Sequence, residues 1–181
     1  MITLLKKNNG IHTVINLHKQ NDNTVKDVTP LPDQDQIRMN IARAPCHFKI
    51  DLSDVYKQVH IMSKDIGKMA FVTIYDTMVS LIMQQGDCNA LFTPQYIMVY
   101  EFRDHIGCFI YVYLDNIFIF SYFIEDDEHH LGIIFNILWT AQLYLKAEKC
   151  DLYSTWVDYL SHIIDHNGLY SDADKMACLR D

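Results

Sequence analysis

Apolar runs broken by turn-forming residues recur along the chain, and two of these runs lead to an aspartate. Residues 46–52 (CHFKIDL) contain Asp51, and residues 109–121 enclose Asp115 and Asn116 between two apolar, aromatic halves. Short runs of β-branched and aromatic residues favour strands, whereas Asp-Asn favours a turn. The pattern predicts a strand that ends at Asp51 and a hairpin with Asp115-Asn116 at its turn. Carboxylates at such strand ends can converge on a hard cation.

Helical spacing of apolar residues marks two segments. Asp33 precedes residues 34–43, in which Ile37 and Ile41 lie four apart on one face, so Asp33 is predicted to be an N-cap. Residues 125–142 begin with an acidic first turn, which favours a helix start. Their apolar stripe is predicted to be core and consists of Leu131, Ile134, Phe135 and Leu138.

The polar residues at the start of that second helix are predicted to lie at the surface. They are the acidic run of residues 125–128 and the pair His129-His130. Acidic side chains near a helix N-terminus are usually solvated and interact favourably with the helix dipole. We therefore assign these residues no chemical role.

A third helix is predicted after the turn at residues 86–89, and it reaches about His105. Proline damages a helix interior, so Thr93 is predicted to be the N-cap and Pro94 the first helical residue. The capping box at residues 171–174 predicts a last helix. The other apolar runs predict short strands, near residues 13–17, 59–62, 69–75, 78–83, 144–146 and 152–153, and a hairpin over residues 159–170. Strands and helices do not alternate strictly, so the predicted fold class is α+β with a mostly antiparallel sheet.

One stretch, residues 108–124, is apolar enough to suggest a membrane span. Its 17 residues include only Asp115 and Asn116 as strongly polar side chains. A membrane helix needs about 20 apolar residues and rarely carries a central carboxylate. Aromatic and β-branched residues on both sides of a turn favour two paired strands instead. We therefore expect no membrane association.

The composition indicates a globular protein rather than a disordered chain. Of the 181 residues, 50% are hydrophobic and 21% are charged. The five cysteines are scattered, without a CxxC pair, which fits free thiols in a reducing compartment better than a disulfide framework. We therefore expect an intracellular protein, cytoplasmic or nuclear.

Negative charge is concentrated in the second half of the chain. The formal net charge is −8, and residues 101–181 hold five Lys and Arg against fourteen Asp and Glu, a balance of −9. Nucleic-acid-binding proteins usually carry a basic surface. The charge balance therefore counts against strong nucleic-acid binding, although acidic residues are expected around a metal site.

Nine stretches match a known family in order and spacing. The chain resembles the reverse transcriptase of gypsy-class long-terminal-repeat retrotransposons over nearly its whole length. The stretches are TVINLHKQNDNTVKDVTPLPDQDQI, FKIDLSDVYKQVHI, DIGKMAFVTIY, MQQGDCNA, FRDHIG, VYLDNIFIFS, EHHLGIIFNIL, LYLKAEKCDLY and YLSHIIDHNGLYSDADKM. The resemblance implies a right-hand polymerase palm with partial fingers, divided into residues 1–45 (partial fingers), 46–170 (palm with inserted fingers strands) and 171–181 (start of the thumb or connection).

The resemblance also implies a function, RNA- or DNA-templated DNA synthesis by two-metal nucleotidyl transfer. The implied partners are an RNA or DNA template with its primer and a deoxynucleoside triphosphate, and the implied cofactor is Mg²⁺ or Mn²⁺. Asp51 and Asp115 match the aspartates that bind metal in the family. Two such ions activate the primer 3′-hydroxyl and stabilise the leaving pyrophosphate.

Other matching positions imply contacts with the incoming nucleotide. Tyr56 matches the residue that screens the sugar 2′-position, and Gln85 and Gly86 match the Gln-Gly that lines the nucleotide pocket. Asn116 is the second residue of the catalytic turn, where the family has a second aspartate. An amide keeps an oxygen ligand and loses the negative charge that offsets a divalent cation.

Further departures fall in functional places of the family. His12, Asn16 and His18 stand where its fingers motif has Arg, Asp and Arg, and residues 91–95 replace its Pro-Ala-Thr-Phe-Gln. We expect a degenerate, truncated copy with Met1 as an internal start and with impaired polymerase activity. The alternative is a non-catalytic relic or a co-opted module that binds nucleic acid or protein.

Overall fold

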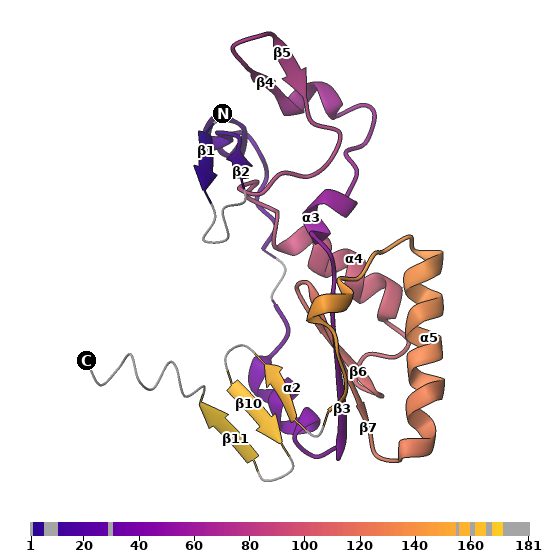
Figure 1. The fold of residues 1–181 in the computed structure, drawn as a ribbon. Helices are drawn as coiled ribbons and strands as arrows, with labels where there is room; N and C mark the ends of the chain where they lie inside the picture. Colours follow the sequence, from indigo (N-terminus) through magenta and orange to yellow (C-terminus); the bar gives the residue numbers. More distant parts are fainter. Residues whose placement is uncertain are drawn as a thin grey trace, which may run out of the picture. The chain divides into compact units, whose positions relative to one another are not determined.

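The computed structural model describes residues 2–5, 11–28, 31–154, 156–159, 162–165 and 168–171 (Figure 1). Its contacts divide the chain into two compact units. Unit 1 comprises Met1–Thr29 and Asp54–Tyr96, and unit 2 comprises Pro30–Ser53 and Ile97–Asp181. The assignment of residues 1–45, 46–170 and 171–181 to polymerase subdomains stays a prediction.

The main sheet of unit 2 has four antiparallel strands in the order β6-β7-β3-β8. They are β3 (Cys46–Asp51), β6 (Ile110–Tyr113), β7 (Asn116–Ser121) and β8 (Asp151–Ser154). The predicted strand ending at Asp51 and the predicted hairpin around residue 115 are both confirmed. β7 lies inside the sheet, and five of its six residues are buried, so its side chains are covered on both faces.

Helices α2 (Gln34–Ile41) and α5 (Asp127–Thr140) both contact β7 (Figure 1). Phe118 and Phe120 of β7 share a hydrophobic cluster with Ile37 and Ile41 of α2. Side chains alternate along a strand, so Ile117, Ile119 and Ser121 point to the opposite face from these two phenylalanines. A hydrogen bond from Ser121 at the end of β7 reaches α5 on that face. The strand is therefore packed between two helices.

The start of α2 agrees with the sequence-based prediction. Asp33 is its N-cap, and the Asp33 carboxylate accepts hydrogen bonds from the backbone N–H groups of Asp35 (2.9 Å) and Gln36 (3.4 Å). These bonds satisfy donors that have no partner within the first turn. Ile37 and Ile41 are both buried, as predicted.

The second predicted helix is divided in two. A 3₁₀ turn, η2 (Ile124–Asp126), leads into α5. Leu131, Ile134 and Leu138 are buried, whereas Phe135 remains 42% exposed. The predicted core stripe is therefore wrong at Phe135. At that turn α5 buries Ile134, whereas Phe135 lines an open pocket.

A three-stranded antiparallel meander completes the described part of unit 2. It consists of β9 (Trp156–Tyr159), β10 (His162–Asp165) and β11 (Gly168–Ser171). Tyr159 and Ile164 join the same hydrophobic cluster as α2 and β7. The last helix, predicted to open at residues 171–174, lies outside the described residues.

Unit 1 is built from short elements. They are β1 (Ile2–Leu5), β2 (Ile11–Val14), α1 (His18–Asp22), α3 (Val55–Gln58), η1 (Ile66–Met69), β4 (Ala70–Val72) and β5 (Thr77–Val79). β1 pairs with β2 and β4 pairs with β5, both antiparallel. The predicted strand at residues 13–17 is displaced, since β2 ends at Val14. The predicted strand at residues 59–62 amounts to one bridge, His60 with Ile82.

Two further predictions need correction. α4 runs from Phe92 to Phe102, so Pro94 is its third residue rather than its first. The proline is still tolerated, because N–H groups in the first helical turn need no helical acceptor. Residues 144–146 do not form a strand, and the structure has only the bridge between Leu52 and Leu145 there.

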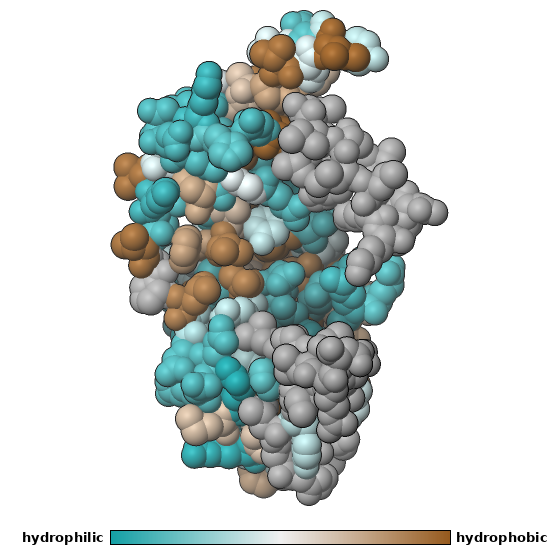
Figure 2. Space-filling model, turned by 90° about the vertical axis from the view of Figure 1, so that its left-hand side faces the viewer, coloured by the Kyte–Doolittle hydropathy of each residue, from teal (hydrophilic) through white to brown (hydrophobic). Residues whose placement is uncertain are grey.

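Within the described ranges, no helix is both long and apolar enough to cross a membrane. Large hydrophobic side chains nevertheless reach the surface, and Figure 2 shows one face on which they lie among hydrophilic ones. The described cysteines, Cys46, Cys88, Cys108 and Cys150, are free thiols.

Candidate active site

The hairpin between β6 and β7 turns within two residues, Leu114 and Asp115. Tyr113 and Asn116 pair across the turn. Leu114 has a φ of 55°, the left-handed backbone that tight hairpin turns need and that costs a non-glycine residue about 1 kcal/mol. The side chain of Leu114 packs against the hydrophobic cluster of unit 2, and this packing offsets the cost.

The pairing of β3 with β7 brings Asp51 to this turn. Asp51 lies directly opposite Asn116, and the Leu52 N–H donates a 2.8 Å hydrogen bond to the Asp115 carbonyl. Side chains of directly opposite residues in an antiparallel pair start about 5 Å apart. Residues 51 and 115 are sixty-four positions apart in the sequence, yet they are neighbours across the sheet.

The Asn116 amide is hydrogen-bonded to one of the two carboxylates, that of Asp115. Its Nδ2 donates a 3.0 Å hydrogen bond to Oδ1 of Asp115. Its Oδ1 is buried and has no hydrogen-bond partner among the described residues. A buried carbonyl oxygen without a donor is costly, and it is free to accept a cation or a hydrogen bond.

Asp51 is held from both its backbone and its side chain. Its carbonyl accepts a 2.8 Å hydrogen bond from the Lys146 N–H, and its Oδ2 lies 3.4 Å from Nζ of Lys149. The residue is only 8% exposed. A carboxylate at this depth needs a counter-ion, and Lys149 supplies one.

These side chains offer two carboxylates and one amide oxygen. Hard divalent cations such as Mg²⁺ and Mn²⁺ prefer such oxygen ligands. Among the described residues, no set of three or more His, Cys, Asp or Glu side chains is arranged to hold a metal. The donor set near the turn is therefore one of oxygen atoms with a low total charge.

The predicted nucleotide-contacting residues belong to unit 1. Tyr56 lies partly buried on α3, and Gln85 and Gly86 form an exposed turn. Gly86 has a φ of 98°, a conformation that favours glycine. The Asn21 side chain fixes this turn, since it donates to the Gly86 carbonyl (2.8 Å) and accepts from the Cys88 N–H (2.9 Å).

A second polar group lies where β3 begins and β7 ends. Cys46 is paired with Ser121, and Ser121 Oγ lies 2.9 Å from Nδ1 of His130, whose ring stacks on Phe109 at 4.0 Å. Burial lowers the pKa of His130 below its ordinary 6.5. His129 is exposed, as predicted, whereas His130 is partly buried.

Asp127 at this end of the sheet needs a correction. The acidic run was predicted to be solvated, yet Asp127 is 0% exposed, and no described nitrogen or oxygen donates to its carboxylate. Its neighbour Cys46 has a pKa raised to about 11, first by burial and then by the contact with Asp127 and its negative charge. The thiol therefore stays protonated and unreactive near neutral pH.

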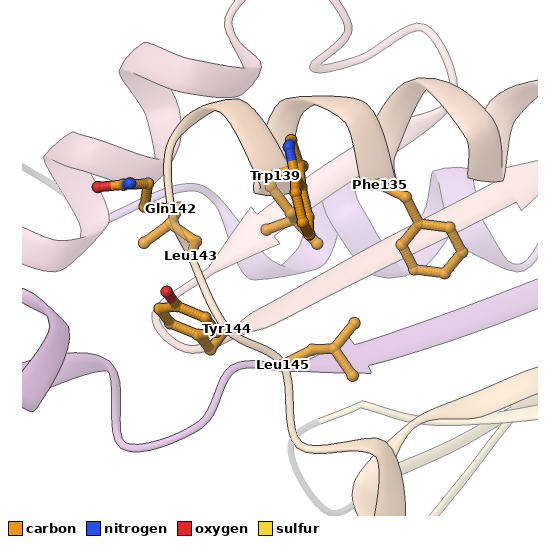
Figure 3. A pocket seen from close by; sticks show the side chains of 7 residues that line it. Phe135, Trp139, Gln142, Leu143, Tyr144 and Leu145 are labelled. Atoms are coloured by element: carbon orange, nitrogen blue, oxygen red, sulfur yellow. The ribbon is translucent and has the colours of Figure 1, made fainter.

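An apolar pocket of about 500 Å³ opens at the end of α5. Figure 3 shows Phe135 and Trp139 on successive turns of the helix, facing the segment that carries Tyr144 and Leu145. Trp139 is 85% exposed. The Tyr144 carbonyl accepts a 2.9 Å hydrogen bond from the Ser53 N–H, so this segment is joined to the residues that follow Asp51.

Sequence reasoning missed Lys149, Asn21 and Asp127. The sequence signal for Lys149 is weak, since a lysine before a cysteine has many uses and the partner lies 98 residues away. The clamp by Asn21 depends on a turn 65 residues further along the chain. The burial of Asp127 depends on how α5 packs. The acidic residues beside it in the sequence give no sign of that burial.

Comparison with known proteins places these features in a family. Residues 4–164 match the model described as reverse transcriptase (RNA-dependent DNA polymerase). The retrovirus-related Pol polyprotein from transposon opus of Drosophila melanogaster is 30% identical over 169 residues, which are 92% of this chain and 17% of that protein. The Pol polyprotein from transposon gypsy of the same species is 27% identical over 168 residues, covering 93% of this chain and 16% of its own length.

A shorter relative is the RNA-directed DNA polymerase homolog of Oenothera berteroana. It is 32% identical over 111 residues, which are 60% of this chain and 76% of that protein. The present chain thus spans only about a sixth of the length of the two Pol polyproteins.

Solved structures support the fold. The foamy viral protease-reverse transcriptase in complex with an RNA/DNA hybrid has a TM-score of 0.87 at 20% identity, covering 99% of this chain and 24% of that one. The same viral protein with double-stranded DNA has a TM-score of 0.88 at 20% identity, covering 99% of this chain and 37% of that one. The predicted α+β fold of a polymerase palm with partial fingers is confirmed. By its sequence and its fold, the chain belongs to the reverse transcriptase (RNA-dependent DNA polymerase) family.

Proposed function

We propose that this chain carries the nucleotidyl-transfer site of an RNA-directed DNA polymerase, weakened by Asn116. The observation that carries the proposal is the position of Asp51 opposite Asn116, with Asp115 in the adjoining turn. In this proposal Asp51, Asp115 and Asn116 are the catalytic residues. The subdomain ranges 1–45, 46–170 and 171–181 belong to the same proposal as partial fingers, palm and the start of the thumb.

Asp51 and Asp115 would hold divalent cations, Mg²⁺ or Mn²⁺, with Asn116 Oδ1 as a neutral third oxygen. When bound, such ions lower the pKa of the primer 3′-hydroxyl and offset the charge of the leaving pyrophosphate. The residues themselves would fix where the cations bind, because Asp51 ends β3 and Asp115 lies in the tight turn that joins β6 to β7, the neighbour of β3 in the sheet.

The proposed substrates are a primed RNA or DNA template and a deoxynucleoside triphosphate. The foamy viral relatives were solved with an RNA/DNA hybrid and with double-stranded DNA, which supports this class of partner. Tyr56 would screen the 2′-position of the sugar, and Gln85 with Gly86 would line the nucleotide pocket. Asn21 would support this pocket, since it holds the Gly86 carbonyl.

Asn116 is the reason to expect weak activity. Replacing a carboxylate ligand by an amide removes one negative charge beside the cations. A loss of about 3 kcal/mol of transition-state stabilisation corresponds to a rate reduction on the order of a hundredfold. We therefore expect that Asn116→Asp restores activity.

Primer extension on an RNA/DNA hybrid, with Mg²⁺ and with Mn²⁺, tests the proposal. We expect Asn116→Asp to extend the primer about a hundredfold faster than the parent chain. The matched control is Asn136→Asp, which adds the same charge at an exposed position on α5 and should leave the rate unchanged. Equal, strong extension by parent and Asn116→Asp would refute the impairment.

A second candidate function is a non-catalytic module that binds nucleic acid or protein. It is favoured by Asn116 and by the balance of −9 in residues 101–181. Filter binding of a primer–template hybrid at several salt concentrations separates the two, because phosphate contacts make binding salt-dependent. Salt-sensitive retention together with extension by Asn116→Asp supports the polymerase. No extension by either chain supports the module.

A further inference from the structure

Lys149 occupies the place at Asp51 where a metal ion would need to bind. Its Nζ lies 3.4 Å from Asp51 Oδ2, and the Lys149 side chain is 55% exposed while that of Asp51 is 11% exposed. The ion pair therefore joins a sheltered carboxylate to a solvent-facing ammonium group. Such a cation can leave without breaking any core packing.

The backbone beside Lys149 is fixed, so its head group returns to the same carboxylate. η3 (Ala147–Lys149) follows Lys146, whose N–H is bonded to the Asp51 carbonyl at 2.8 Å. The Lys149 N–H donates in turn to the Lys146 carbonyl at 2.9 Å. The segment thus holds the start of the Lys149 side chain next to β3, while its four-carbon stem remains long enough to swing away.

The charge balance of the site makes this pair significant. With Asn116 neutral, the turn and β3 together present two carboxylates, and Lys149 already offsets one of them. A divalent cation at Asp51 would face an ammonium group within a few ångströms, and like charges at that distance repel. Lys149 and a metal therefore cannot both lie close to Asp51 Oδ2 without a loss of affinity.

We propose that Lys149 is a displaceable counter-ion of Asp51, which competes with the divalent cation and has to move away when the cation binds. The inference rests on the proposed function, because it requires that Asp51 binds metal. It adds a residue that sets metal affinity in this chain, where the second aspartate of the turn is missing. Lys149 is a positioning residue in this account, because it acts through Asp51.

The test is direct Mn²⁺ binding to the full chain, measured by isothermal titration calorimetry without nucleotide or nucleic acid. Exposed ion pairs are weak, so Lys149→Gln should lower the Mn²⁺ dissociation constant about two- to fivefold. Lys146→Gln is the matched control, since it removes the same charge three residues away. The Lys146 side chain is exposed and forms no ion pair with Asp51 in the part of the chain that the structure describes. Lys146→Gln should change the Mn²⁺ dissociation constant less than half as much as Lys149→Gln does.

A second measurement does not depend on calorimetric heats. Thermal melting in EDTA and in Mn²⁺ should show a larger Mn²⁺-induced stabilisation for Lys149→Gln than for the parent chain, because at a fixed concentration a ligand that binds the folded state more tightly raises the melting temperature further. Lys149→Arg keeps the positive charge and should behave like the parent.

Each outcome decides between the inference and the proposed function. Equal or weaker Mn²⁺ affinity of Lys149→Gln, with binding that Asp51→Asn abolishes, overturns the role of Lys149 and leaves the metal site standing. Binding that survives Asp51→Asn unchanged overturns the metal site itself. No saturable binding by the parent or by Lys149→Gln overturns both.

Discussion

The two ends of the β3–β7 pair differ in the surroundings that they give to a carboxylate. At one end Asp51 lies opposite Asn116, beside the partly buried tight turn and next to the ammonium group of Lys149. At the other end Cys46 lies opposite Ser121, and Asp127 is fully buried at the first residue of α5. The paired strands therefore have a tight turn at one end and the start of a helix at the other.

The difference shows why only one end suits metal chemistry. Asp127 lies at the positive end of the helix dipole, which favours its charge without any mobile cation. Its surroundings include the Cys46 thiol, whose pKa is raised, and His130, whose pKa is lowered, and within the described residues it belongs to no group of three or more His, Cys, Asp or Glu side chains that could hold a metal. Asp51, in contrast, shares its corner with a second carboxylate and an amide oxygen that lacks a donor. Burial of a carboxylate by itself is therefore a poor guide to function.

The largest expected effect is on the rate of primer extension, when Asp51 is neutralised and Asp127 is not. In the Asn116→Asp background, Asp51→Asn should slow primer extension at least about a hundredfold, because it removes a metal ligand. Asp127→Asn in the same background should change the rate less than about twofold. Single-turnover extension at saturating nucleotide measures both. A large loss with Asp127→Asn would break the contrast between the two ends.

A smaller effect is expected on stability. Asp127→Asn should raise the free energy of unfolding by about 1 kcal/mol, because among the described residues the buried Asp127 carboxylate has only the weak thiol donor of Cys46, and relief of this buried charge exceeds the lost interaction with the helix dipole. Urea unfolding of parent and variant, followed by circular dichroism, measures the difference. A decrease of more than about 1 kcal/mol would mean that the Asp127 carboxylate is paired in solution.

The smallest effect is a dependence of stability on pH. Burial lowers the pKa of His130, so below about pH 6.5 the unfolded chain takes up a proton that the folded chain resists. The contribution of neutral His130 to stability is therefore full above pH 6.5 and is lost as the pH falls toward its lowered pKa. Thermal melting between pH 8 and pH 5 should show a decline that His130→Gln reduces.

His129→Gln provides the control for that measurement, because the neighbouring ring is exposed. It should leave the decline in melting temperature unchanged. If both variants flatten the profile equally, the pH dependence does not come from the partly buried His130 ring beside Ser121.

Local patterns were enough to predict those parts of the fold that local chemistry determines. The cap at Asp33, the strand to Asp51 and the hairpin at Asp115 follow from residue types within a few positions. The start of α4 was misplaced by two residues, because proline is tolerated anywhere in the first helical turn.

Features that depend on distant contacts could not be predicted in the same way. The Lys149–Asp51 pair requires η3 to return beside β3. The burial of Asp127 requires α5 to pack on β7. Phe135 is exposed because this packing does not cover its side of the helix. Nothing in the neighbouring sequence distinguishes Asp127 from the exposed acids around it.

The open pocket at the end of α5 has an optical consequence. Trp139 is one of two tryptophans in the chain, and its indole is mostly in water, as is about half of Trp156. Indole emission shifts to shorter wavelengths when water around the ring is replaced by apolar groups. Any molecule or protein segment that seats itself between Phe135 and Tyr144 will therefore blue-shift the fluorescence, so the chain carries an intrinsic spectroscopic reporter for occupancy of that pocket.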